Sequence, residues 1–205
     1  MASPVDICNL ALARLGDEAR VVSINPPDQS AQANYCSIFY DMTLKSVLSD
    51  YPWAFASQVI ALASVTNNDA RWLYAYGLPA DCLTINNAFP TDSVSYDSVT
   101  NNVAYVLKRG QSGRLELFTN QLNISIDYTQ SITDTTLFDA LFIDALAFRL
   151  AANLAGVIIK GDTGAAAAMK LMQFYKVLLK GAMENDANSQ NANSVYTPSG
   201  IAARA

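Results

Sequence analysis

The 205-residue sequence contains no histidine and only three cysteines. Histidine is the commonest general base and the commonest metal ligand in proteins, so its absence narrows the chemistry open to the chain. The cysteines, Cys8, Cys36 and Cys82, are widely spaced and form no CxxC pair, which argues against a zinc site. We therefore expect no metal and no other cofactor, and free, mostly buried thiols in a reducing compartment.

Basic residues are also few. The chain has 13 Lys and Arg side chains against 18 Asp and Glu side chains, a formal net charge of -5. General nucleic-acid binders are usually basic because they neutralise phosphates, so this class of protein is disfavoured. By contrast, 51% of the residues are hydrophobic. A chain of this length builds a sizeable core without help from metals or disulfides.

No segment predicts secretion or a membrane anchor. The segment Met1 to Leu12 lacks a basic start and contains Asp6, unlike a signal peptide. The longest apolar run, residues 141–159, is interrupted by Asp144, Arg149 and Asn153. These polar side chains favour a buried helix over a membrane span.

The N-terminal part of the sequence predicts two helices. Ser3-Pro4-Val-Asp6 is a typical helix start, and Gly16 is a typical stop. The second helix is expected to be capped by Asp28 or Ser30. It ends at Pro52, because the residue before a proline avoids the helical region.

This second helix is apolar on more than one side. One set of residues forms a stripe at helical spacing, and a further set widens it: Ala31, Tyr35, Ile38 and Met42, then Phe39, Leu44, Val47, Leu48 and Tyr51. A helix that is apolar around much of its circumference is usually buried. We therefore expect more than one face of this helix to be covered.

The middle third predicts an antiparallel β region of about four to six strands, from alternation and turn signals alone. Val59 to Leu62 is expected to be a strand. Two hairpins are expected in addition: Val94–Val99 with Val103–Leu107, and Leu115–Phe118 with Leu122–Tyr128, the latter joined at Asn120 and Gln121.

Helical periodicity returns near Thr135. Apolar residues surround nearly the whole segment 137–150, which predicts the central helix of the core. Gly161-Asp162-Thr163-Gly164 is expected to interrupt it, and a last amphipathic helix follows with a stripe of Ala168, Met172, Tyr175, Leu179 and Met183. Beyond Asp186 the pattern ends, so we expect an extended or disordered tail.

Together these patterns predict an α+β fold, in which a helical bundle formed from both chain ends carries an inserted antiparallel β subdomain and a flexible C-terminal tail. The expected boundaries are 1–55 and 134–187 for the two helical parts of the body, 56–133 for the β subdomain and 188–205 for the tail.

The densest basic cluster consists of Lys108, Arg109 and Arg114, and the glycines around it indicate a mobile loop tip. Two interpretations fit. The cluster meets a phosphate backbone or an acidic partner surface, or it is a soluble β-turn whose charges are solvated.

Asp144 and Arg149 lie on the mostly apolar central helix. They are candidates for a buried or interfacial ion pair, with a neighbouring subunit or at the edge of the chain's own core. Asp139 and Asp144 are five residues apart and share no helix face, so they do not form an acid–base pair. Serines lack the GxSxG and SxxK patterns. We therefore expect no catalytic residues and no enzymatic activity.

Aromatic residues gather around the start of the β region: Tyr51, Trp53, Phe55, Trp72, Tyr74 and Tyr76. Such density marks either an anchor at an interface or a core junction. The sequence leaves both interpretations open.

Three blocks of residues stand in a fixed order along the chain. They are Asn9-Leu-Ala-Leu12 with Leu15-Gly16, Tyr40-Asp41 and Tyr51-Pro-Trp53-Ala-Phe55-Ala; then Tyr74-Ala-Tyr76-Gly-Leu78-Pro79-Ala-Asp81-Cys82-Leu83; then Ala145 to Ala152, followed by another helix. In this order they resemble the tail tubular protein A group of short-tailed bacteriophages, the head-to-tail adaptor (connector) proteins. The likeness covers roughly residues 5–185.

The resemblance implies a structural virion protein, made in the bacterial host cytoplasm, that forms a ring below the portal, usually a dodecamer. Such a ring extends the DNA channel, helps to close the filled head and supports the tail nozzle. The implied partners are the portal protein, the nozzle protein and further copies of the chain. DNA passes through without sequence-specific binding, and no membrane anchor is implied.

On this reading we expect Tyr196 and Ile201 of the tail to anchor the chain to the portal. Lys108, Arg109 and Arg114 are expected to face the nozzle or the DNA. Two other functions are alternatives: a tail-associated cell-wall hydrolase, which needs paired carboxylates in a cleft, and another virion component such as a tail terminator or a decoration protein.

Overall fold

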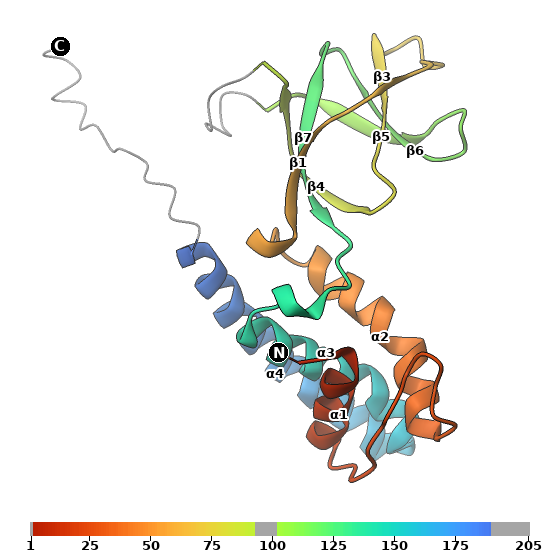
Figure 1. Cartoon of the computed structure of the whole chain (residues 1–205), viewed down its shortest axis with the longest axis vertical. Coiled ribbons are helices and arrows are strands. Elements are labelled where there is room, and N and C mark those ends of the chain that lie inside the picture. The colour runs from red at the N-terminus through yellow and green to blue at the C-terminus, as the bar shows by residue number, and fades with distance from the viewer. Residues whose placement is uncertain (1, 93–101, 190–205) are drawn as a thin grey trace, which may run out of the picture.

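The computed structural model describes residues 2–92 and 102–189 of the chain. Its helices gather at one end of the molecule and its strands at the other (Figure 1). The mixed α+β class predicted from the sequence is confirmed. The helices are α1 (Pro4–Leu15), α2 (Ala31–Ser49), α3 (Ala140–Ile158) and α4 (Gly161–Ser189), with short 3-10 turns η1 (Ala54–Ala56) and η2 (Thr135–Leu137).

Local capping sets the ends of the first two helices. Ser3 and Asp6 form a capping box at the start of α1, and Gly16 ends it at a φ of 77°. Ser30 caps α2 by accepting a hydrogen bond from the Ala33 amide at 3.1 Å. The predicted helix start at Ser3, the stop at Gly16 and the cap at Ser30 are confirmed.

The core of the helical end is built around α3. Nine residues of α3 are buried, and α1, α2 and α4 all pack against it. This helix is long and apolar enough to cross a membrane by length and composition, but here its apolar side chains meet three other helices. The prediction of a central core helix is confirmed, with its first residue at Ala140 rather than near Thr135.

The break between α3 and α4 is shorter than the sequence suggested. The chain turns at Lys160 and Gly161, whose φ angles are 59° and 63°, and the predicted breaker residues Asp162 to Gly164 already belong to α4. α4 then continues to Ser189, so residues 188 and 189 of the predicted tail are helical.

The strands form two antiparallel sheets, in the orders β1-β7-β4 and β2-β3-β6-β5. Their buried side chains make a second core, which includes Tyr76, Leu117 and Ile126. The strands are β1 (Ser57–Ala61), β2 (Ser64–Val65), β3 (Tyr74–Gly77), β4 (Cys82–Pro90), β5 (Tyr105–Arg109), β6 (Leu115–Thr119) and β7 (Ile124–Gln130).

The second predicted hairpin is wrong. Residues 115–118 and 122–128 fall in β6 and β7, but β6 pairs with β3 and β5, whereas β7 pairs with β1 and β4. Both are inner strands that need partners on each side, and the turn between them carries the chain from one sheet to the other. The strand Val94–Val99 of the first predicted hairpin lies outside the described residues, so this hairpin stays a prediction. Its second predicted strand, Val103–Leu107, overlaps β5, which pairs with β6 on one side.

The chain enters and leaves the β end through neighbouring strands. Ser57, the first residue of β1, lies opposite Thr129 of β7. Just before β1, Trp53 is buried in the helical core, where its ring contacts those of Phe55 and Phe142. At Trp53 and Phe55, the aromatic density is therefore a core junction between the two ends of the molecule.

Candidate functional site

The basic cluster lies on the hairpin formed by β5 and β6. Lys108 pairs in register with Glu116, and Arg109 with Leu115. The turn between the strands is closed by backbone hydrogen bonds, from Gly110 N to the Arg114 oxygen at 2.9 Å and from Gly113 N to the Gly110 oxygen at 3.1 Å. The tip is therefore a hydrogen-bonded turn.

The three cations of the cluster have different surroundings. Lys108 Nζ lies 2.7 Å from Asp69 Oδ2, and Arg109 Nε donates to the Gly113 oxygen at 3.1 Å. Arg114 is exposed and, among the described residues, makes no ion pair. The predicted trio thus separates into one structural lysine and two arginines at the tip.

Asp69 is the partner that sequence reasoning missed. Its carboxylate accepts hydrogen bonds from the guanidinium of Arg71 and from Lys108. These two cations hold the pKa of the Asp69 carboxyl well below its ordinary value. Asp69 precedes Lys108 by 39 residues, so no local pattern indicated that they meet.

Glu116 lies buried beneath the turn, with 3% of its surface exposed. Ser112 Oγ donates to Glu116 Oε1 at 2.7 Å, while Oε2 has no hydrogen-bond partner among the described residues. A carboxylate inside the apolar run Leu115-Glu116-Leu117-Phe118, next to a glycine-rich turn, was the available sequence signal for this arrangement.

Gly110 makes room for the Glu116 carboxylate. A Cβ atom at this position would lie 1.7 Å from Glu116 Oε2. We expect Gly110→Ala to displace that carboxylate, break its bond to Ser112 and lower the free energy of unfolding by about 1–3 kcal/mol. Urea denaturation measures the loss, and Gly156→Ala is the matched control, because a Cβ there meets nothing within 4 Å.

The same clash predicts non-additive effects. In Glu116→Ala the displaced group is gone, so adding Gly110→Ala to it is expected to cost much less than Gly110→Ala alone. Equal costs in the two backgrounds would mean that Gly110 acts through backbone conformation and not through Glu116.

Asp144 and Arg149 face different neighbours. Asp144 Oδ1 lies 2.7 Å from the guanidinium of Arg14 on α1, and that guanidinium is 4.5 Å from the ring centroid of Phe148. Asp144 and Arg149 do not pair with each other among the described residues. Five residues apart on a helix, their side chains point about 140° away from each other. The ion pair of Asp144 therefore joins α3 to α1 within the chain.

Arg149 is held in the interface between α3 and α4. Its NH1 lies 2.7 Å from Met172 Sδ, and its guanidinium lies 5.3 Å from the ring centroid of Tyr175. Burial raises the pKa of the Tyr175 phenol above its ordinary value, as does its hydrogen bond to Asp50. This arrangement places Arg149 at the edge of the chain's own core.

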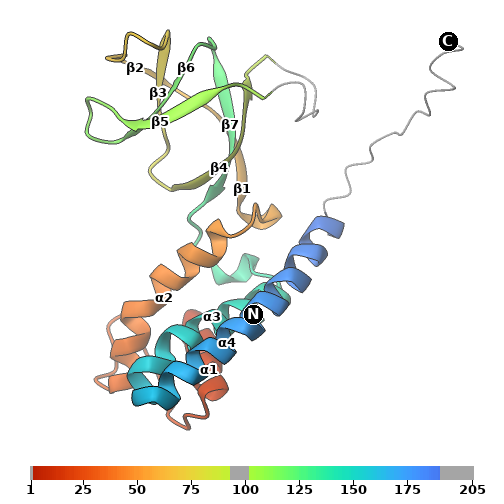
Figure 2. The ribbon, with the colours of Figure 1, turned by 180° about the vertical axis from the view of Figure 1, so that it is seen from behind.

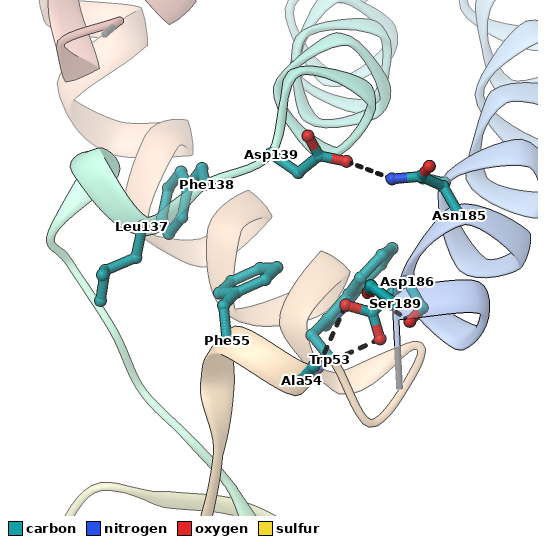
Figure 3. A pocket seen from close by; sticks show the side chains of 10 residues that line it. Trp53, Ala54, Phe55, Leu137, Phe138, Asp139, Asn185, Asp186 and Ser189 are labelled. Atoms are coloured by element: carbon teal, nitrogen blue, oxygen red, sulfur yellow. Dashed lines mark hydrogen bonds between the residues drawn. The ribbon is translucent and has the colours of Figure 1, made fainter. Parts of the chain in front are cut away.

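An open pocket of about 400 Å³ lies where α4 ends beside η1 and the start of α3 (Figure 3). Both carboxylate oxygens of Asp186 accept hydrogen bonds from the Ala54 amide, at 3.1 and 3.2 Å. Asp139 caps α3 through the Ala140 amide and accepts a bond from Asn185 at 2.7 Å. These oxygens join α4 to η1 and to the start of α3.

The three cysteine thiols are partly or fully shielded from solvent. Cys8 and Cys36 are free and buried, as predicted, while Cys82 is half-buried. Burial, reinforced by the nearby Asp81 charge, raises the pKa of the Cys82 thiol to about 11. At neutral pH this thiol is protonated and is a poor nucleophile.

Tyr196 and Ile201, the predicted tail anchors, lie outside the described residues. Within those residues, no group of three or more His, Cys, Asp or Glu side chains is placed to hold a metal ion. Comparison of the sequence with models of known protein families finds no match, and neither does comparison with curated proteins.

Proposed function

We propose that this chain is the head-to-tail adaptor of a short-tailed bacteriophage. It forms a ring, a dodecamer by resemblance, between the portal and the tail nozzle. The ring extends the DNA channel and helps to close the filled head. In this proposal the helices from both chain ends form the body of the ring, residues 56–133 project as a β subdomain, and the C-terminal tail docks the portal.

The observation that carries the proposal is the ordered set of sequence blocks that resemble the adaptor group. Each block supplies residues to a packed part of the fold. Trp53 and Phe55 lie at the junction between the helical end and the β end, Tyr76 lies in the core of the β end, and Ala145 to Ala152 lie at the centre of α3. Residues in such positions determine a fold, which supports a likeness of architecture rather than of isolated short motifs.

The charge of the chain supports a channel-forming role. Twelve copies, each with a net charge of -5, would together carry about -60 before counterions are counted. An acidic channel wall repels the DNA backbone and lets the DNA slide, whereas a basic wall would hold it.

Electron microscopy tests the proposal. Purified chain is incubated with portal rings from the same phage, and native mass spectrometry counts the bound copies. An adaptor adds one ring at the narrow end of the portal. A decoration protein coats capsid shells instead, and a hydrolase lowers the turbidity of a peptidoglycan suspension. Either of these results without a portal-bound ring would contradict the proposal.

The tip of the β5–β6 hairpin gives another test of the proposed function. Replacing Arg109 and Arg114 together with alanine is expected to weaken docking to the nozzle protein about tenfold at low salt, with a smaller difference at high salt, because rim charges act mainly over long range. Lys108→Ala is the comparison, and it is expected to destabilise the β end because it removes a partner of Asp69. Unchanged nozzle binding in the double variant would make the tip a solvated turn.

A further inference from the structure

α2 is apolar on two opposite faces, and its own chain covers one of them. The covered face, which includes Cys36, Tyr40 and Leu44, packs towards α3. On the opposite face Ile38 is 66% exposed and Met42 57% exposed. The sequence predicted that more than one face of this helix is covered, but in the described part of the chain Ile38 and Met42 on the second face stay exposed.

The second face forms a continuous stripe, in which Ile38 and Met42 are exposed while Tyr35 and Phe39 are half-buried against the helical core. Tyr35, Ile38, Phe39 and Met42 follow the spacing i, i+3, i+4, i+7, which places them side by side on a helix. We call these four residues the α2 stripe. None of the four carries a charge. The charged residues nearest to them in sequence, Asp41 and Lys45, form an ion pair at 2.7 Å, so their charges offset each other beside the stripe.

α4 presents a second, different exposed face. Met169 is 68% exposed and Val177 72% exposed, and the lysines Lys170, Lys176 and Lys180 lie around them. Residues 165–183 contain these three lysines and no carboxylate, and the carboxylate that follows, Glu184, lies 3.8 Å from Lys180 Nζ. We call Met169, Val177 and the three lysines the α4 face. In Figure 2, α4 runs across the near side of the helical end, with α2 at the left edge.

The two surfaces are complementary in charge. Residues 1–55, which contain α1 and α2, carry six carboxylates against three cationic side chains. Two of these carboxylates, Asp17 and Glu18, lie close to the first turn of α2, since Gln32 of that helix donates to Asp17 Oδ2 at 3.2 Å. An acidic border beside the α2 stripe therefore matches the basic border of the α4 face.

We propose that the α2 stripe of one copy packs against the α4 face of the next copy. Because the two surfaces differ, this contact is heterologous: each copy uses one surface on each side, and the contact repeats around an axis until it closes. The apolar side chains of Ile38, Met42, Met169 and Val177 are buried at its centre, and the lysines meet the acidic border at its rim. The inference rests on the proposed function for the closure of the ring, but the contact itself is testable without a phage partner.

Cysteine cross-linking tests the contact. In a Cys82→Ser background, Met42→Cys and Val177→Cys are made as two separate single variants, treated with a short bismaleimide and analysed on denaturing gels, alone and on portal rings. We expect a covalent dimer when the two variants are mixed, and little from either alone. Combined in one chain, they are expected to give a ladder of multimers. Leu73→Cys, at a similarly exposed position on the β end, is the control: mixed with Met42→Cys or with Val177→Cys it is expected to give little dimer.

A charge substitution gives an independent measurement. Ile38→Lys is expected to weaken self-association by tenfold or more in sedimentation velocity, because it buries a charge at the centre of the contact. Leu73→Lys is expected to leave it unchanged. Circular dichroism checks that both variants fold, as their exposed positions predict.

The outcomes separate the contact from the proposed function. Cross-links between two Met42→Cys chains, or a portal-bound ring without mixed cross-links, overturn the inference while leaving the adaptor function standing. Mixed cross-links in the free protein without any binding to portal rings support the contact and overturn the adaptor function. The absence of cross-links both alone and on the portal overturns the contact.

Discussion

Trp53→Ala is expected to lower the free energy of unfolding by about 3–5 kcal/mol, the range for removing a large aromatic side chain from a core. The Trp53 ring is buried, with ring centroids 4.9 Å from Phe142 and 5.1 Å from Tyr51. Its indole nitrogen donates to the Val47 oxygen at 3.0 Å. The substitution therefore leaves a cavity at the joint between α2 and the β end, and it removes one of the two hydrogen bonds to the Val47 oxygen, the other coming from the Asp50 amide at 3.3 Å.

Urea denaturation followed by far-ultraviolet circular dichroism measures this loss. Trp72→Ala is the matched control, because Trp72 is the other tryptophan of the chain and is only half-buried. We expect it to cost less than half as much. If Trp53→Ala cost under 1 kcal/mol, the junction would not be part of the helical core.

Truncation after Ser189 is expected to weaken binding to the portal about 100-fold or more. The described part of α4 ends at this residue, so the cut keeps every described helix whole. In the proposed function Tyr196 and Ile201 anchor the chain, and buried anchors contribute about 2 kcal/mol or more each, which corresponds to roughly thirtyfold in affinity. If both residues are anchors, their removal is expected to have a large effect on portal binding.

Surface plasmon resonance on immobilised portal rings measures the affinity of the truncated chain. Tyr196→Ala and Ile201→Ala divide the effect between the two anchors, and Asn191→Ala is the control within the same segment. Portal affinity that survives truncation would remove the tail from the proposed function and leave docking to the helical body.

The features that the sequence predicted well are those set by near neighbours. Ser3 and Gly16 mark the ends of α1 through contacts within a few residues. The apolar circumference of α3 follows from its own composition. In each case the physical cause lies within one or two helical turns of the residue.

The features that the sequence did not predict depend on distant partners. β4 was not predicted, because its register shifts twice against β7, between Cys82 and Thr84 and between Ile85 and Asn87, and such bulges break the alternation of a strand. Arg14 meets Asp144 across 130 residues. The buried Glu116 depends on a glycine whose role appears only when the hairpin is closed.

The pairing of Ser57 with Thr129 has a consequence for how this protein can be engineered. The β end of the molecule is joined to the helical end by two chain segments that lie side by side: one leads into β1 and the other leaves β7. A different domain that takes the place of the β end must therefore begin and end on neighbouring strands. The helical end can therefore keep its packing around α3 while the attached β part is replaced.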